Sequence, residues 1–382
     1  NRRLLYRNPL GDSLANGSNP QLVFAPELLT STNLLLTDAT RPNDQYWGRN
    51  LLSAWYVDYR LPFFENKLVL TVGLRAEWML QELDTRDYGG NPLNWSDPVL
   101  DLLPSAEIHW RFDPRHSLRA SYSRSLQRPS FRQFSPLEVY DPLLEARWTG
   151  NAELERAVVD NLDLRYEHRP QPDDILAVGL WGKRFQNPLE RVTYYSSTGT
   201  DRTITWRNLE EAWVYAAEVE WRKSLRFINA GFFQHFSSVL QAHYALYDIT
   251  TDPFDPAANP DRPLQGFAPW QVHTGLHYDN PRIGLSFHVG YAWQAPTIWA
   301  AGVEGEGDWY DMPRHLISGS FAKTIGKWFE IRAEAQDALG AAVMRVQDTN
   351  ADGELDDESG ADRVLLNYTP GQWASLSLIF RW

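Results

Sequence analysis

The sequence predicts an all-β protein, an antiparallel transmembrane β-barrel with about 13 visible strands, or 14 if a partial strand near residues 2–7 is included. Three observations predict it. Apolar and polar residues alternate from about residue 50 to the end, several alternating runs reach 10 to 12 residues, and short links between runs alternate with long ones. Each of these patterns is typical of strands that cross a bilayer and have two different faces.

The run 283–294 shows the alternation most clearly. Its odd positions are large and apolar, from Ile283 to Trp293, whereas its even positions are small or polar, from Gly284 to Gln294. Runs of this length are about what a tilted strand needs to cross a bilayer, and they exceed the five or six residues usual in soluble sheets. The pattern therefore favours membrane-spanning strands.

The links between the runs fall into two classes that take turns along the chain. Short links lie near 64–66, 113–116, 169–174, 224–226, 279–282 and 324–327. Long links are expected near 82–100, 130–160, 195–202, 248–264, 300–309 and 347–362. Short turns and long loops then occupy opposite ends of one sheet, which is the plan of outer-membrane barrels.

The inward faces of several runs carry mixed charges, which argues against a soluble sandwich. Examples are the three sets Glu107, His109 and Arg111; Asp163, Arg165 and Glu167; and Glu330, Arg332 and Glu334. Opposite charges on neighbouring strands can pair in a wet lumen, whereas a dry core would impose a heavy desolvation cost. Trp and Tyr near strand ends, as at Trp78 and Trp382, suit interfacial girdles.

Composition excludes several classes of function and partner. The chain has no Cys and a formal net charge of −13, from 36 Lys and Arg against 49 Asp and Glu. The absence of Cys excludes a disulfide scaffold and cysteine chemistry, and the acidic balance argues against nucleic acid as a partner. Neither an apolar run long enough for a spanning helix nor a targeting segment is visible.

Three segments carry a family resemblance. They are "SLRASYSRSLQRPSFRQFSP" at 117–136 with "GNAELE" following at 150–155, "VGLRAEW" at 72–78, and the closing strand 367–382 with its Pro370-Gly371 pair. Over about 50–382 the chain resembles the barrels of TonB-dependent outer-membrane receptors. It departs from their pattern at Ala152, Gln372 and Trp382, where Pro, Arg and Phe are usual.

The resemblance implies a barrel of about 22 strands that encloses a plug. Since the sequence shows neither a plug nor an energy-coupling box, we interpret residues 50–382 as the C-terminal part of such a barrel and residues 1–49 as an outer loop or partial strand. The implied function is TonB-dependent active transport of a small-molecule, glycan or peptide ligand across the outer membrane. Its implied partners are outer-membrane lipid and a TonB-type energy-coupling protein, which would act through an N-terminal region.

Two alternatives of different class stay open at this point. A self-contained porin-like or fatty-acid-type barrel would conduct solutes passively, and a structural barrel would serve within an outer-membrane complex. An enzyme is not expected, because the sequence contains no G-x-S-x-G, H-E-x-x-H or Walker-type motif and its nine His residues lack ligand spacing.

One long link contains a candidate calcium loop. The D-x-N-x-D-G pattern places oxygen ligands at loop positions 1, 3 and 5, and the carbonyl at position 7 adds another. The predicted ligands are Asp348, Asn350, Asp352, Glu354 and Asp356. Position 12 is Ser359 rather than Glu, so the alternative interpretation is an acidic, solvated outer loop.

A second long link, with the residues just before it, combines arginines with aromatic residues. The candidate ligand-binding residues are Arg128, Arg132, Tyr140, Arg147 and Trp148. Aromatic rings beside guanidinium groups on an outer loop suit an anionic or sugar-like ligand. The alternative explanation is that these residues fold the loop over the barrel mouth.

Overall fold

The structure is a computed structural model of the 382-residue chain. It describes residues 4–7, 35–38, 41–87, 89–195, 202–228, 231–250, 262–350, 353, 355 and 362–381. Nearly all regular structure in these residues is β, and it forms three sheets. The smallest pairs β1 (Leu4–Arg7) with β2 (Leu35–Asp38), within the segment predicted to be an outer loop or partial strand.

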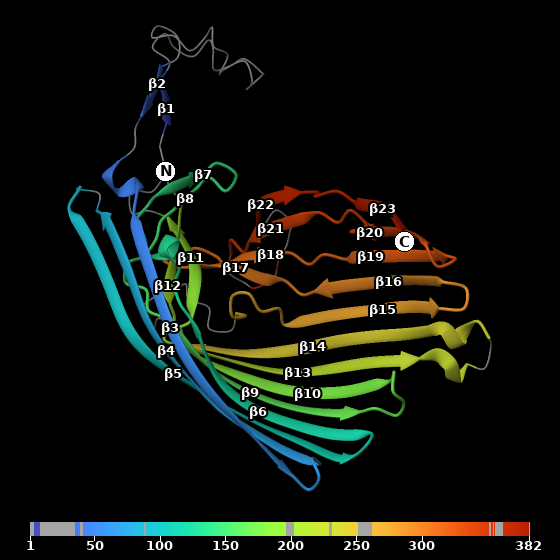
Figure 1. The fold of residues 1–382 in the computed structure, drawn as a ribbon. Coiled ribbons are helices and arrows are strands. Elements are labelled where there is room, and N and C mark those ends of the chain that lie inside the picture. Colours follow the sequence, from blue (N-terminus) through green and yellow to red (C-terminus); the bar gives the residue numbers. More distant parts are fainter. Residues whose placement is uncertain are drawn as a thin grey trace.

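The largest sheet is a curved wall of 13 antiparallel strands, each paired with the next wall strand along the chain (Figure 1). This confirms the predicted fold class. The strands are β3 (Trp47–Phe63), β4 (Leu68–Arg86), β5 (Pro92–Asp113), β6 (His116–Gln127), β9 (Ala157–His168), β10 (Ile175–Gln186), β13 (Glu211–Ser224), β14 (Phe236–Thr250), β15 (Trp270–Asn280), β16 (Leu285–Gln294), β19 (Leu316–Ile325), β20 (Phe329–Gln336) and β23 (Trp373–Phe380).

The two faces of the wall differ as the alternation predicts. In β13, Ala212, Val214 and Ala216 are buried on the inner face, where Leu264 of a returning segment packs against them. The neighbouring odd positions, such as Tyr215, lie on the opposite, outer face and are exposed. The exposed outer face is apolar because it is the surface that contacts lipid in a barrel of this kind.

The inner face carries the predicted charge pairs. Arg165 donates to Glu167 at 3.0 Å and to Glu218, on a strand two places away, at 3.3 Å. Arg332 likewise donates to Glu330 at 2.8 Å. These carboxylates and guanidinium groups neutralise one another both within a strand and across strands, as expected for a wet lumen.

The prediction of a long link at 82–100 is wrong. Strand β4 continues to Arg86 and β5 begins at Pro92, so that only residues 87–91 connect them. The pairing persists because tertiary packing supports it: Leu83 is fully buried against Phe134. Phe134 belongs to the short helix α2 (Phe131–Phe134), which folds back onto the wall.

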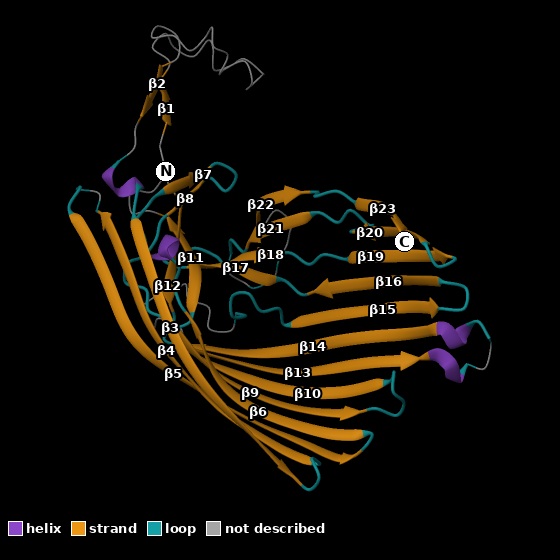
Figure 2. Ribbon diagram, viewed as in Figure 1, coloured by secondary structure: helices purple, strands orange, loops and turns teal. Residues whose placement is uncertain are grey.

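Four of the other long links, near 130–160, 195–202, 300–309 and 347–362, contribute to structure that the sequence did not indicate, an eight-stranded second sheet that we call the mouth sheet (Figure 2). Residues 251–261 of the link expected near 248–264 lie outside the described residues. The mouth sheet contains the parallel pairs β11–β17 and β12–β8, which join segments far apart in sequence. Its strands are β7 (Val139–Asp141), β8 (Ala146–Trp148), β11 (Leu189–Tyr195), β12 (Arg202–Asn208), β17 (Thr297–Gly302), β18 (Trp309–Asp311), β21 (Val343–Gln347) and β22 (Arg363–Tyr368).

The mouth sheet lies at the end of the wall opposite the short turns (Figure 1). The turn between β13 and β14 contains the 3₁₀ helices η2 (Leu225–Phe227) and η3 (Phe233–His235), and a further 3₁₀ helix, η1 (Pro42–Asp44), precedes β3. The short turns and the long, structured links therefore occupy opposite ends, as the sequence predicts. Trp382 lies outside the described residues.

Within the part of the chain that the structure describes, no helix is long and apolar enough to cross a membrane.

The close approach of β18 and β21 gives a first testable prediction. A Cβ atom added to Gly307 would lie 1.6 Å from the Asp348 carbonyl oxygen, so Gly307→Ala must separate the two segments. We expect the free energy of local opening around β21 to fall by about 1–3 kcal/mol, as for other overpacked sites. Hydrogen exchange of the β21 amides measures it.

The matched control is Gly231→Ala in a short turn, where an added Cβ meets no atom within 4 Å. Equal exchange in both variants and the wild type would contradict the predicted contact.

Candidate functional site

The candidate site centres on Arg191, the third residue of β11 in the mouth sheet. Its guanidinium carbon lies 4.1 Å from the ring centroid of Trp299 on β17 and 5.4 Å from that of Trp148 on β8. Arg345, on β21, lies 3.7 Å from the Trp299 centroid. Three strands of the mouth sheet thus bring two cations onto one indole, a cation–π arrangement that is strongest when water is excluded.

The two arginines differ in how their charge is balanced. Arg345 donates to Asp311 at 2.7 Å. Arg191 donates from Nη1 to the Trp299 carbonyl at 2.9 Å, and among the described residues no carboxylate lies within ion-pair distance of it. The site therefore carries one positive charge in excess.

Burial and, after it, the nearby charge of Arg345 lower the pKa of Arg191 to about 10. A guanidinium with a pKa of about 10 remains almost fully protonated at neutral pH. Arg191 is thus a partly desolvated cation whose interactions with an incoming anion are stronger than those of a fully solvated arginine.

A buried ion pair positions Arg191. The preceding residue, Glu190, accepts from Nη1 of Arg262 at 3.0 Å and also from Nη2, and both side chains are almost fully buried. Gln265, three residues beyond Arg262, bridges Arg191 and Trp299: its Oε1 accepts from the Arg191 backbone amide at 2.8 Å and its Nε2 donates to the Trp299 carbonyl at 2.7 Å. The segment that follows Arg262 is held across β11 by these bonds.

Arg191 opens onto a cavity of about 500 Å³ between the mouth sheet and the inner face of the wall. Trp299, Phe185 and Phe267 contribute aromatic surface to it, and Gln265 and Asp311 contribute polar groups. This combination of apolar walls with a few converging polar groups is usual for small-molecule sites.

The structure places the predicted ligand-binding residues in different surroundings. Trp148 contacts the Arg191 site, as described above. Tyr140 is 58% exposed on β7, and Arg147 lies 3.6 Å from Glu138. The predicted set is therefore not gathered around one cavity, and ligand binding by Tyr140 and Arg147 stays a prediction.

Arg128 and Arg132 make contacts that hold the polypeptide in place. Arg128 donates to Glu77 and to Asp101, each at 2.7 Å, on the inner faces of β4 and β5. Arg132 donates to the carbonyl of Leu137 at 2.9 Å. These bonds agree with the alternative interpretation that the arginines fold the loop over the mouth.

Only part of the candidate calcium loop is described. Asp348 is nearly buried, and its Oδ2 accepts from the Gly353 amide at 3.0 Å, which closes a tight turn. Asn350 is described, whereas Asp352, Glu354 and Asp356 lie outside the described residues. Among the described residues no group of three or more His, Asp or Glu side chains is arranged to hold a metal ion. Calcium binding by this loop stays a prediction.

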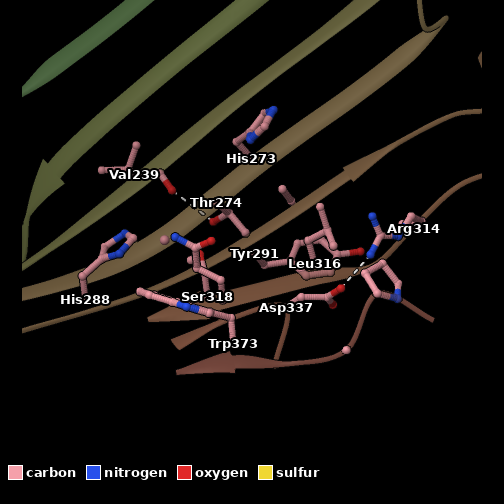
Figure 3. A pocket seen from close by; sticks show the side chains of 16 residues that line it. Val239, His273, Thr274, His288, Tyr291, Arg314, Leu316, Ser318, Asp337 and Trp373 are labelled. Atoms are coloured by element: carbon pink, nitrogen blue, oxygen red, sulfur yellow. Dashed lines mark hydrogen bonds and ion pairs between the residues drawn. The ribbon is translucent and has the colours of Figure 1, made fainter. Parts of the chain in front are cut away.

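A second cavity, of about 680 Å³, lies along the inner side of β15, β16 and β19 (Figure 3). Gly275 and Gly290 pair there in register and leave the wall bare, and the ring of His288 lies against them. At one end Arg314 donates to Asp337 at 2.6 Å (Figure 3). Because this arginine is paired with a carboxylate, the cavity has no comparable excess charge. It is therefore a weaker candidate than the Arg191 site for binding an anion.

Sequence reasoning missed Arg191, Trp299 and Arg345. They lie on three short strands, and the contact between Arg191 and Trp299 spans 108 residues. Neither the period of the pattern nor a local motif could bring them together. Two clues were present: each lies in a segment between wall strands, and such segments gather at the same end of the sheet.

A family model described as TonB dependent receptor-like, beta-barrel, matches residues 4–335. A search of curated proteins found no match.

Several solved structures share the fold. A mutant of the ferric enterobactin receptor PfeA from Pseudomonas aeruginosa, in complex with enterobactin, is 13% identical with a TM-score of 0.55; the match covers 94% of this chain and 56% of that one. The ferric-catecholate import receptor Fiu from E. coli K12 is 11% identical with a TM-score of 0.59, over 91% and 46%. The copper transporter OprC is 13% identical with a TM-score of 0.58, over 91% and 50%. The chain thus spans about half the length of these proteins.

Removal of the Arg128 side chain tests its anchoring role. In Arg128→Met, Glu77 keeps Arg75 as a partner and Asp101 keeps Arg156, but each loses one charged hydrogen bond in a poorly solvated place. We expect the loop that carries α2 to open more easily by about 2 kcal/mol, as for hydrogen bonds to charged groups. Hydrogen exchange of residues 131–156 measures the change.

Arg226→Met is the control, because Arg226 lies 3.5 Å from Asp173 with both side chains more than half exposed, and such pairs contribute little. An unchanged loop in Arg128→Met would exclude the anchoring role.

Asp308, in the turn before β18, makes the mouth sheet sensitive to pH. Burial, with smaller contributions from the charges of Glu190 and Asp348, raises its pKa to about 6. Arg262 and the Gly302 amide, which donates to Asp308 at 2.8 Å, act in the opposite direction. The folded chain then holds this proton more tightly than the unfolded chain. Its stabilising contribution is complete below about pH 4 and is lost as the pH rises through 6.

In Asp308→Asn the amide oxygen still accepts from Gly302, but no proton is lost. We therefore expect the pH dependence of Gly302 amide protection between pH 4 and 6 to flatten in this variant, and to persist in Asp173→Asn, which alters an exposed turn. Identical pH profiles for Asp308→Asn and the wild type would show that another group titrates.

Proposed function

Because this chain belongs to the TonB-dependent receptor-like β-barrel family, we propose that it forms barrel wall and ligand-binding mouth of a receptor that imports an anionic ligand bearing aromatic groups. The family resides in the outer membrane, and the wall described above is its barrel. Import is proposed to be TonB-dependent active transport, with a TonB-type energy-coupling protein as partner.

One observation carries the ligand class: the excess positive charge of Arg191 at an aromatic cavity. An anion gains charge-assisted hydrogen bonds from a guanidinium that no carboxylate among the described residues neutralises. A flat aromatic group gains stacking on Trp299 and the phenylalanines of the cavity. Two of the structural relatives are named as receptors for ferric enterobactin and ferric catecholates, which supports the same class.

The residues of this chain would capture the ligand at the mouth and line the path beyond it. Arg191 and Arg345 attract and orient the anion at the mouth, and Gln265 keeps Arg191 and Trp299 at a fixed spacing. Beyond the mouth, the inner face presents paired charges such as Arg165 with Glu167, which keep the path hydrated without a net attraction that would hold the ligand.

Three other functions are less well supported. A passive channel lacks support from the family, and the relatives named in the comparison are receptors and transporters rather than enzymes. Uptake of a free metal cation, as the name of the copper transporter OprC suggests, is opposed by the positive charge of Arg191 and Arg345 at the candidate site.

Replacement of Arg191 tests the proposal. In Arg191→Gln the excess charge is lost while much of the side-chain volume remains. We expect the intact receptor to bind ferric enterobactin, an anionic catecholate complex, about 10- to 100-fold more weakly, because a hydrogen bond to a charged group contributes about 1.5–3 kcal/mol. Quenching of tryptophan fluorescence measures the binding.

A neutral ferric hydroxamate complex is the second probe, and its binding, if present, should not change between wild type and Arg191→Gln. Arg207→Gln is the matched control, since Arg207 lies in the same sheet but pairs with Glu304 at the surface. Equal affinity of Arg191→Gln and wild type for the anionic probe, or no binding of that probe by wild type, would refute the ligand class.

A further inference from the structure

The outer face of the wall contains a groove that the proposed transport function does not use. It has a volume of about 800 Å³ and lies across β9, β10, β13 and β14. Its residues include Leu162, Leu180, Tyr215 and Leu246, which are each about half exposed. These residues share the face opposite the inner aromatic cavity, so the groove opens toward the membrane and not toward the lumen.

The groove exists because a side chain is missing from the middle of it. Gly182 on β10 pairs in register with Tyr215 on β13 and with Leu162 on β9. An added Cβ atom on Gly182 would lie 3.5 Å from the Tyr215 ring, an ordinary contact distance, so the backbone does not require glycine here. The hollow can therefore be filled without strain.

One end of the groove is polar. Arg124 donates to both oxygens of Asp160, at 2.8 and 3.1 Å, and Tyr122 donates to the same carboxylate. Arg184, two residues beyond Gly182, donates from Nη2 to Glu211 at 2.8 Å. Since β10 ends at Gln186 and leads into the mouth sheet, this polar end is the end nearest the outer surface.

The groove thus has aliphatic residues along its length and tyrosines at its side. The guanidinium group of Arg184 lines its outer end, and Arg124 lies next to the groove on the other side of Asp160. A guanidinium has five N–H donors. Among the described residues Arg124 uses two of them, and Arg184 uses one on Nη2 while its Nε is buried. Donors on the terminal nitrogens remain for phosphate oxygens, which guanidinium groups bind in a bidentate manner. The polar end of the groove therefore matches the headgroup of a membrane lipid, and its aliphatic length matches an acyl chain.

We propose that the groove binds one membrane lipid with a phosphate headgroup. An acyl chain lies over Gly182 between Leu162, Leu180 and Leu246, and the phosphate contacts Arg184 and Arg124. The lipid fills a hollow that fluctuating chains of the bulk bilayer would otherwise fill only in part, and it ties the outer ends of four wall strands to the headgroup layer.

Native mass spectrometry of the intact receptor in detergent, titrated with dipalmitoyl phosphatidylglycerol, tests the proposal. The wild type should retain one lipid more tightly than the rest, and Gly182→Leu should weaken this binding at least tenfold. Ala333→Leu is the control: Ala333 faces the same side of the wall between Phe321 and Leu376, six strands away in the sheet, so the variant adds a side chain to the outer face but not to the groove.

The headgroup contact has its own test. Arg184→Gln should weaken binding of phosphatidylglycerol but not of dipalmitoylglycerol, which has the same chains and no phosphate. Arg226→Gln, at the opposite end of the wall, should change neither. The heat-dependent mobility of folded barrels on gels checks that every variant is folded.

Equal lipid binding by Gly182→Leu, Ala333→Leu and wild type would overturn the proposal. A folded Arg184→Gln variant that binds both lipids as the wild type does would overturn the headgroup contact, and retention of inorganic phosphate alone would assign the arginines to a free anion.

Discussion

Backbone hydrogen bonding across the wall is the constraint on which the rest of the structure depends. Inside a bilayer no water can replace a missing partner, so every amide of a spanning strand must pair with its neighbour. The 11 inner strands of the wall satisfy this by antiparallel pairing on both sides, whereas β3 and β23 at its edges pair on one side within the described residues. Because successive side chains of a paired strand point to opposite faces, the same constraint separates a lipid-facing surface from a wet inner surface. The outer groove and the inner charge pairs are both consequences of that separation.

At the mouth a different interaction takes over. The pair of Glu190 and Arg262 is almost fully buried, and a pair of that kind is expensive to break, since either partner alone would be left as an uncompensated charge. It fixes the segment that carries Gln265, and Gln265 in turn spaces Arg191 from Trp299. One well-satisfied ion pair thereby helps to position the neighbouring arginine, which has no carboxylate partner among the described residues. The position of Arg191, which is proposed to attract the ligand, therefore depends on the neutralised pair of Glu190 and Arg262 beside it.

The wall could be predicted from sequence because its information is local. A run such as 283–294 reports its own two faces, and the inward positions of Arg165 and Arg332 follow from the same period. The mouth sheet could not be predicted, because pairs such as Val192 with Ala301 depend on register between distant segments rather than on any local pattern. Tertiary packing also extended β4 and β5 through a link expected to be a loop, where Leu83 meets Phe134. Of the predicted ligand residues, only Trp148 lies at the Arg191 site, since Arg128 and Arg132 are occupied by structural contacts.

The length of β5 has a consequence for how the mouth meets its ligand. A strand of 22 residues is roughly 70 Å long, whereas a tilted strand crosses the apolar band of a membrane in about 10 residues. About half of this strand therefore extends beyond the membrane into water, where its pairing keeps it rigid. Loops attached to such a support lose little conformational entropy when a ligand arrives, because the rigid strands beneath them have already restricted their motion. The mouth would then bind the proposed ligand in a conformation that is already formed, rather than by closing around it.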